Sequence, residues 1–254
     1  PVVIVPLILW FGWRGMFQIL GIVGLVYVFF YTLFVKQTKP QEETKEDKSK
    51  KNKYFLHLLK FSLIWKLILC AFCISCINKG LDAWMPTYLI AERGINLKAV
   101  GYLTPIPFIA SFLSTAVCGW VMNKYFDKKE NWMIVICAAL TAIFLYFMYN
   151  AETIMWVVIF QCGVYFFKAC ILGTAVAIVL KIVTGSIAGS ASTLINMGGQ
   201  VAGFISPIIM GYLVYAFNGS FNAVFYYLMG VAALCAISAL LIPTRKEDML
   251  DLEK

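Results

Sequence analysis

Charged residues are scarce in this chain of 254 residues. Lysine, arginine, aspartate and glutamate together make up 13% of the sequence, whereas they make up about 25% of a soluble globular domain. Hydrophobic residues account for 61%, and the mean hydropathy is +0.82. A water-soluble enzyme of one or two domains is therefore close to excluded, and the composition predicts an integral membrane protein.

Histidine is nearly absent, since His57 is the only one. The sequence also contains no phosphate-binding glycine loop, no Ser-His-Asp set and no His/Cys metal-ligand spacing. We therefore predict no enzymatic activity, no cofactor and no bound metal. Cys73 and Cys76 could hold zinc only with a second ligand pair. The eight cysteines are instead expected to be small apolar residues, because all lie in apolar runs: Cys70, Cys73, Cys76, Cys118, Cys137, Cys162, Cys170 and Cys235.

Acidic residues are fewer than basic ones, and the formal net charge is +8. Most of the cations lie in short stretches between apolar runs rather than along one folded face, which argues against a nucleic-acid partner. The chain begins at Pro1, inside an apolar run, with no initiator methionine and no signal-type cleavage site. We therefore expect a piece of a longer polypeptide.

The apolar runs are long enough to cross a bilayer as helices, which requires about 20 residues each. A partial span before Gly12 precedes spans at roughly 14–35, 62–90, 98–122, 131–150, 153–180, 186–217 and 221–243. Aromatic residues near the ends of these runs are typical of rings at headgroup depth: Trp10, Trp13, Tyr54, Trp65, Trp84, Trp120, Trp132 and Trp156.

The cations predict the orientation of the spans, because positive loops stay in the cytoplasm. Fifteen lysines and arginines fall at 36–60, 123–130, Lys181 and the C-terminal tail, against three in the alternate connections. The expected location is therefore the plasma membrane, as a multi-pass protein with a cytoplasmic C-terminus. Residues 36–60 contain a polar run, 37–53, that has no apolar side chains to bury, and they are expected to form a flexible basic linker. Contact with membrane lipid headgroups is the alternative.

Three motifs resemble the major facilitator superfamily. The segment Gly12-Trp13-Arg14-Gly15-Met16-Phe17 is similar to the beginning of its sixth helix. Gly80, Asp82, Trp84, Pro86 and Tyr88 match the seventh-helix pattern of its anion-transporting groups. The glycine-rich eleventh helix is resembled by Ala188, Gly189, Ile195, Asn196, Gly198, Gly199, Gly203, Pro207 and Gly211.

This resemblance implies a fold and a division of the chain. Residues 1–35 would be the end of helix five and helix six of an N-terminal half. Residues 61–243 would be the C-terminal six-helix bundle, followed by a cytoplasmic tail at 244–254. Helices one to four, which carry the coupling carboxylates in proton-coupled members, would lie outside this chain.

The loop motif after the eighth helix departs from the family pattern: Asn123 stands where the family has aspartate, and Asp127 lies near the place of its glycine. In the family, that aspartate is thought to stabilise the inward-closed state through charge pairing. The resemblance therefore leaves the strength of this pairing in doubt here.

Charged residues at bilayer depth are costly and indicate functional sites. Lys168 is the strongest candidate, because it lies next to the midpoint between Glu152 and Lys181. A cavity-facing ammonium there would attract an anion; pairing with a backbone carbonyl or with an acid from the missing half is the alternative.

Lys79 and Asp82 share one helical face and could pair with each other, in which case they would not bind substrate. In organophosphate:phosphate antiporters the substrate-binding arginine corresponds to Asn78, one residue before Lys79. The resemblance therefore makes Asn78, Lys79 and Asp82 candidate substrate contacts, without a bidentate phosphate grip.

Uncharged polar residues form a second set of candidate substrate contacts. Asn196 and Gln200 share a face of the eleventh helix, and in anion:cation symporters a residue near Asn196 contributes to substrate contact. Interhelical hydrogen bonding is the alternative. Tyr165 and Gln161 lie one and two turns before Lys168 on roughly its face. Tyr88 lies near the outer end of its helix, where a role in the aromatic belt is expected.

Small residues and prolines are candidates for gating. Gly199 and Gly203 allow helices to approach closely, and Pro207 removes one backbone hydrogen bond. Pro105 and Pro107 are expected to interrupt the eighth helix in the same way. Gating by alternating access and ordinary tight packing both require such residues.

The resemblance implies a secondary active transporter of a small organic anion: a sugar acid, a carboxylate or a sugar phosphate. Proton or sodium symport, or phosphate exchange, would drive it. The excess of lysine over aspartate in the spans supports an anionic substrate. The alternative is a transporter-like sensor of sugar phosphates that signals through a partner membrane protein, because such sensors share the fold.

Overall fold

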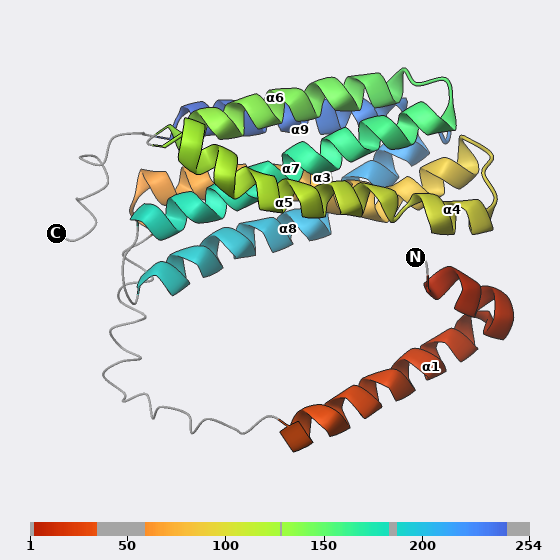
Figure 1. The fold of residues 1–254 in the computed structure, drawn as a ribbon. Coiled ribbons are helices and arrows are strands. Elements are labelled where there is room, and N and C mark those ends of the chain that lie inside the picture. Colours follow the sequence, from red (N-terminus) through yellow and green to blue (C-terminus); the bar gives the residue numbers. More distant parts are fainter. Residues whose placement is uncertain (1–2, 35–58, 128, 183–186, 243–254) are drawn as a thin grey trace.

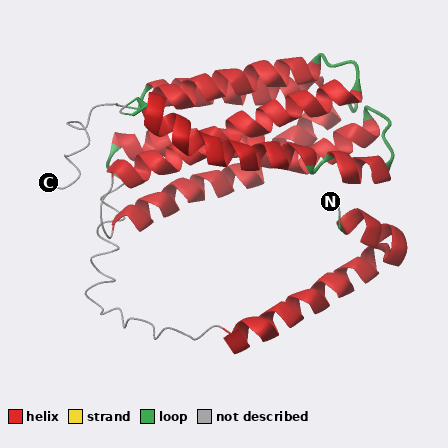
Figure 2. Ribbon diagram, viewed as in Figure 1, coloured by secondary structure: helices red, strands yellow, loops and turns green. Residues whose placement is uncertain are grey.

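A computed structural model of the chain describes residues 3–34, 59–127, 129–182 and 187–242, and every regular element in these ranges is an α-helix (Figures 1 and 2). Seven helical segments of this part are long and apolar enough to cross a membrane, with α4 and α5 counted as one. The predicted spans are therefore confirmed. The predicted tail and most of the predicted linker lie outside the described residues. The helices are α1 (Ile4–Phe34), α3 (Ser62–Ala91), α4 (Leu97–Leu103), α5 (Ile106–Tyr125), α6 (Glu130–Tyr149), α7 (Ile154–Ile182), α8 (Ile187–Ala216) and α9 (Asn222–Leu240).

The first helix stands apart from the others (Figure 1). It is broken at Gly12, whose backbone angles (φ 69°, ψ 172°) are not helical. A side chain is strained at that φ, so glycine suits the break. The boundary between the partial first span and the next span is therefore where the sequence predicts it. Met16 is the one residue of α1 that the structure buries. The exposed apolar surface of α1 suits contact with lipid or with other membrane segments.

The remaining helices form one bundle (Figure 1). The helix α3 packs closely against both α8 and α9. The helix α9 contacts α6, α6 contacts α7, and α7 contacts α5. The helix α3 also contacts α7 directly. The two helices that carry the predicted mid-membrane charges, α3 and α7, are thus neighbours, and α8 contacts both of them.

Proline interrupts the predicted span at 98–122. The short helix α4 begins after Asn96, whose side chain accepts a hydrogen bond from the Ala99 N–H at 2.8 Å. The helix ends at Leu103, and α5 begins after Pro105. Pro107 lies in the first turn of α5, where backbone N–H groups make no hydrogen bond within the helix, so the N–H that proline lacks is not needed. The predicted interruption is confirmed at Pro105, and Pro107 causes no further break.

Two aromatic residues expected near the bilayer surface lie inside the bundle. Trp84 donates from Nε1 to the Pro207 carbonyl at 3.0 Å. Tyr88 is 3% exposed, and its ring packs edge-on against Phe221, with centroids 5.3 Å apart. Both rings thus pack against the parts of the bundle around α8 and α9 rather than facing outward, and their depth in the bilayer stays a prediction. Exposed tryptophans agree with the aromatic-belt prediction elsewhere: Trp10, Trp13, Trp65, Trp120, Trp132 and Trp156.

The cysteines lie within the apolar helices, as the sequence predicts, and all except the half-buried Cys162 are buried. Cys70, Cys73 and Cys76 are fully buried on one face of α3. All eight cysteines are free thiols, and the Sγ atoms of Cys70 and Cys235 lie 3.6 Å apart. The described residues contain no group of three or more metal-ligating side chains. These thiols therefore contribute packing between α3 and its neighbours.

Candidate functional site

Lys168 is buried in the middle of α7 and is only 4% exposed. Its ammonium group donates a hydrogen bond to Asn78 Oδ1 over 2.6 Å and lies 3.7 Å from Asp82 Oδ1. It also lies over the ring of Tyr165, 3.1 Å from the ring centroid. A buried charge is tolerated only with such partners. These contacts therefore explain how a lysine can lie so deep in an apolar helix.

The carboxylate of Asp82 is held by a second partner. The hydroxyl of Tyr165 donates to Asp82 Oδ1 over 2.5 Å. Asn78 and Asp82 lie one turn apart on α3, while Tyr165 and Lys168 lie one turn apart on α7, so each pair shares a helix face. The ring of Phe108 from α5 packs edge-on against Tyr165 at 5.2 Å between centroids. We call Asn78, Asp82, Tyr165 and Lys168 the polar cluster.

This arrangement settles how the charged side chains pair. The spacing on one helix allowed Asp82 to pair with Lys79, but Asp82 faces Lys168 instead. Pairing of Lys168 with a backbone carbonyl or with an acid beyond this chain was the alternative to an anion site. The structure supplies a side-chain acceptor and an acid from α3 of the same bundle. The packing of α3 against α7 decides this, because the two residues are 86 positions apart in the sequence.

Lys79 differs from Lys168 in its surroundings. Its side chain is exposed, and it makes no ion pair or hydrogen bond with the described residues. Its aliphatic stem rests on α8, where a methyl group added at Gly203 would lie 3.2 Å from Lys79 Cγ. The glycine thus leaves room for the lysine stem between the two helices.

A cavity of about 380 Å³ lies beside the polar cluster. Lys168 and Asn78 line it from α7 and α3, and the hydroxyl-bearing residues Ser111 and Thr115 line it from α5. Neither hydroxyl residue is among the predicted substrate contacts, although their spacing of four places them on one face of a helix. The cavity therefore combines one cation with neutral hydrogen-bonding groups. The remaining lining residues are Ile74, Ser75, Ala169, Leu172, Gly173 and Val176.

The other predicted polar contacts lie in two different environments. Gln161 is 2% exposed and lies one turn before Tyr165 on α7, so it is next to the polar cluster. Asn196 and Gln200 are exposed on α8, and neither makes a hydrogen bond with the described residues. The structure therefore brings Gln161 together with the polar cluster and leaves Asn196 and Gln200 apart from it.

The predicted gating residues lie where α8 packs on α3. A methyl group added at Gly199 would lie 2.7 Å from Ser75 Oγ. Pro207 lies inside the continuous helix α8, and its carbonyl accepts the hydrogen bond from Trp84. Gly199, Gly203 and Pro207 thus all contact α3, as tight packing requires. Their role in gating stays a prediction.

The loop that departs from the family pattern contains a surface ion pair. Lys181 Nζ, at the end of α7, lies 2.7 Å from Glu130 Oε1 and 3.4 Å from Asp127 Oδ1. The hydrogen bond to Glu130 raises the pKa of Lys181 above its usual value. Asn123 is exposed. The charge in this loop therefore comes from Asp127 and Glu130, and both pair with a helix of the same bundle.

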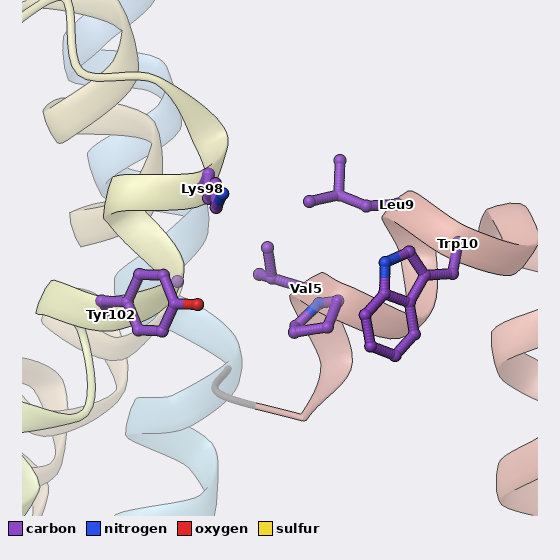
Figure 3. Close-up of a pocket in the computed structure, with 7 residues that line it drawn as sticks. Val5, Leu9, Trp10, Lys98 and Tyr102 are labelled. Carbon is purple, nitrogen blue, oxygen red and sulfur yellow. The ribbon is translucent and has the colours of Figure 1, made fainter.

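A second cavity, of about 310 Å³, lies between α1 and α4 (Figure 3). Val5, Leu9 and Trp10 face it from α1, while Lys98 and Tyr102 face it from α4. A methyl group added at Gly101 would lie 2.9 Å from Val5 Cβ, so the two helices touch beside the cavity. None of the predicted site residues lines it.

Comparisons with known proteins agree with the fold and the predicted resemblance. The family model described as Major Facilitator Superfamily matches residues 1–167. The probable galactarate/D-glucarate transporter GudP of Escherichia coli K12 is 27% identical over 177 residues, which cover 67% of this chain and 38% of that protein. The D-galactonate transporter of Escherichia coli O6:H1 is 24% identical over 165 residues, covering 63% of this chain and 37% of that protein. This chain thus spans about two fifths of the length of these relatives.

A solved structure shows the same fold. It is a bacterial homologue of the human lysosomal transporter Spinster, in an inward-facing and unoccupied conformation. The TM-score is 0.66 at 13% identity, and the alignment covers 95% of this chain and 60% of the other. At that identity, the likeness concerns the fold alone.

Proposed function

The chain belongs to the Major Facilitator Superfamily, and from that premise we propose that it forms part of a secondary active transporter of small organic anions, with sugar acids as the substrate class. The similarity to transporters named for galactarate, D-glucarate and D-galactonate supports this class. Because the chain spans only part of these relatives, the proposal concerns the full-length protein.

The position of Lys168 in the wall of a cavity is the observation that carries the proposal. Its ammonium group lies in the wall of a cavity of about 380 Å³, which falls within the usual range for small-molecule sites, about 300–1,000 Å³. A carboxylate in this cavity can accept a hydrogen bond from Lys168. The amide of Asn78 and the hydroxyls of Ser111 and Thr115 can bond to the hydroxyl groups of a sugar acid. Lys79 adds a second positive charge that no described acid neutralises.

The direction in which the cavity extends supports alternating access. From Lys168 its lining continues along α7 to Val176 and along α3 to Ile74, toward the helix ends that the cation distribution assigns to the cytoplasm. In this proposal a second conformation opens the same site to the outside.

Uptake by cells that express the full-length protein tests the proposal. Cells without their own sugar-acid transporters would receive labelled galactarate, galactonate, glucuronate or glucose 6-phosphate. We expect saturable uptake of at least one sugar acid, and unlabelled acid should compete with it. Lys98→Ala is the control for variants that remove a lysine from the site, because Lys98 is exposed and lines the other cavity. It should leave uptake unchanged.

Two results would overturn the proposal. One is uptake of a neutral or cationic solute with none of these anions. The other is binding of an anion without any transport, which would favour the sensor.

A further inference from the structure

The polar cluster contains an acid that an anion-binding site does not need. Asp82 places a negative charge 3.7 Å from the ammonium group that would attract the substrate. Its side chain is 30% exposed and lies one turn from Asn78, which lines the cavity. At such distances a full negative charge strongly reduces the attraction of the site for anions.

The contacts of Asp82 show that it is more than the partner of Lys168. Direct hydrogen bonds between an ammonium and a carboxylate are about 2.7–2.9 Å long, and 3.7 Å exceeds that length. The short hydrogen bond of Lys168 goes to the neutral Asn78, while Asp82 receives its own from Tyr165. Asp82 can therefore stay in place when Lys168 binds another carboxylate, so its charge persists in the loaded site.

We propose that Asp82 determines which charge state of substrate the site prefers. This inference rests on the proposed function and deepens it. Lys168 lines the cavity, Asp82 lies beside it, and Lys79 is exposed next to Asn78 on α3, so the charges on and around the site sum to +1. A substrate with one carboxylate matches that sum, and a second carboxylate meets the field of Asp82. The residue thus acts as a selectivity determinant for sugar acids with one carboxylate over those with two.

An Asp82→Asn variant of the full-length protein tests this. Galactonate carries one carboxylate and galactarate carries two, and both are otherwise six-carbon polyols. The measured quantity is the inhibition constant of each acid against uptake of a labelled substrate, taken as the ratio of galactarate to galactonate. Removing one negative charge a few ångströms from the site should lower this ratio about tenfold.

Two variants keep the test decisive if Asp82→Asn fails to reach the membrane. Asn78→Asp adds a carboxylate that can still accept the hydrogen bond of Lys168, and it should raise the ratio about tenfold. The swap Asn78→Asp/Asp82→Asn moves the carboxylate by one turn and keeps the sum of charges. Its ratio should stay near that of the unaltered protein.

Glu152→Gln is the matched control, because it removes an equal charge from an exposed position outside the cavity. It should leave the ratio unchanged. If Asp82→Asn leaves the galactarate-to-galactonate ratio unchanged, Asp82 does not determine selectivity. If Asp82→Asn does not reach the membrane, an unchanged ratio in Asn78→Asp leads to the same conclusion. If neither acid competes in the unaltered protein, the proposed function fails instead, so the two failures are distinguishable.

Discussion

Two lysines lie near the middle of the bundle, and their surroundings are opposite. Lys168 is 4% exposed and contacts Asn78, Asp82 and Tyr165. Lys79 is exposed and rests on Gly203, with no ion pair or hydrogen bond to the described residues. The first charge is compensated before any substrate arrives, whereas the second is not.

The difference teaches that depth in the membrane does not by itself define a binding residue. A buried lysine held by several partners is fixed in position and can orient a ligand. An exposed lysine attracts anions over a longer range, but its flexible stem is fixed less well. We therefore expect Lys168 to dominate affinity, and Lys79 to contribute a smaller electrostatic share.

Replacing Lys168 should have the largest effect. Lys168→Met keeps an unbranched side chain but removes the charge, so a bound carboxylate loses its charged hydrogen-bond donor. Such bonds contribute about 1.5–3 kcal/mol, so the concentration for half-maximal uptake should rise about tenfold to hundredfold. The measurement is sugar-acid uptake, normalised to protein in the membrane.

The variant also leaves Asp82 without its cation, which could weaken folding. Lys168→Met/Asp82→Asn removes both charges and should restore the amount of folded protein without restoring affinity. Recovery of affinity in this double variant would show that Lys168 does not bind the substrate.

Replacing Lys79 should have a smaller effect. Lys79→Gln removes an exposed charge that interacts with the substrate through a more polar environment, where attraction is weaker and is screened by salt. We expect the concentration for half-maximal uptake to rise about threefold to tenfold, more at low ionic strength than at high. An effect equal to that of Lys168→Met would contradict the comparison between the two lysines.

Displacing the stem of Lys79 should have a still smaller effect. Gly203→Ala places a methyl group 3.2 Å from Lys79 Cγ, so the stem must move by a few tenths of an ångström. The half-saturating concentration should change less than about threefold, in the direction seen for Lys79→Gln. Gly189→Ala on the same helix is the control, because no atom lies within 4 Å of its added methyl group.

A third lysine, paired at the surface, should matter least. Lys181 binds Glu130 and Asp127, but its side chain is 43% exposed. Surface ion pairs contribute about 0.2–1 kcal/mol, so Lys181→Gln should lower the free energy of unfolding by no more than this. Thermal unfolding of the full-length protein in detergent measures the change, and uptake should remain near that of the unaltered protein.

The pH dependence of that contribution follows from the raised pKa of Lys181. The folded protein holds the proton more tightly than the unfolded chain, so the stabilisation is fully present below the ordinary lysine pKa of 10.5. It is lost as the pH rises through the higher pKa of the folded state. Between pH 7 and pH 9 the difference between Lys181→Gln and the unaltered protein should therefore be constant.

Much of the fold was predictable because membrane spans leave a local signal. The lengths of the apolar runs, the break at Gly12 and the interruption at Pro105 all follow from a few neighbouring residues. The depth of Lys168 follows in the same way, since it needs only the two ends of its helix. The candidate site was predictable to the extent that it depends on such depth.

The pairing of the charges was not predictable in this way. The sequence offered Lys79 as a partner for Asp82, because both lie on one helix, whereas the structure brings in Lys168 and Tyr165 from α7. Trp84 and Tyr88 illustrate the same limit, since the sequence placed them in the aromatic belt but not against the parts of the bundle around α8 and α9. Ser111 and Thr115 gave too weak a signal, because isolated hydroxyl residues are common in membrane helices.

The sequence by itself determined that the chain crosses a membrane, where its helices begin and end, and which charges lie deep within them. These properties depend on the hydropathy and backbone preferences of neighbouring residues. Only the tertiary structure decided which of the deep charges are neutralised and which face a cavity. That depends on contacts between helices far apart in the chain, where a shift of one residue along a helix turns a side chain by about 100°.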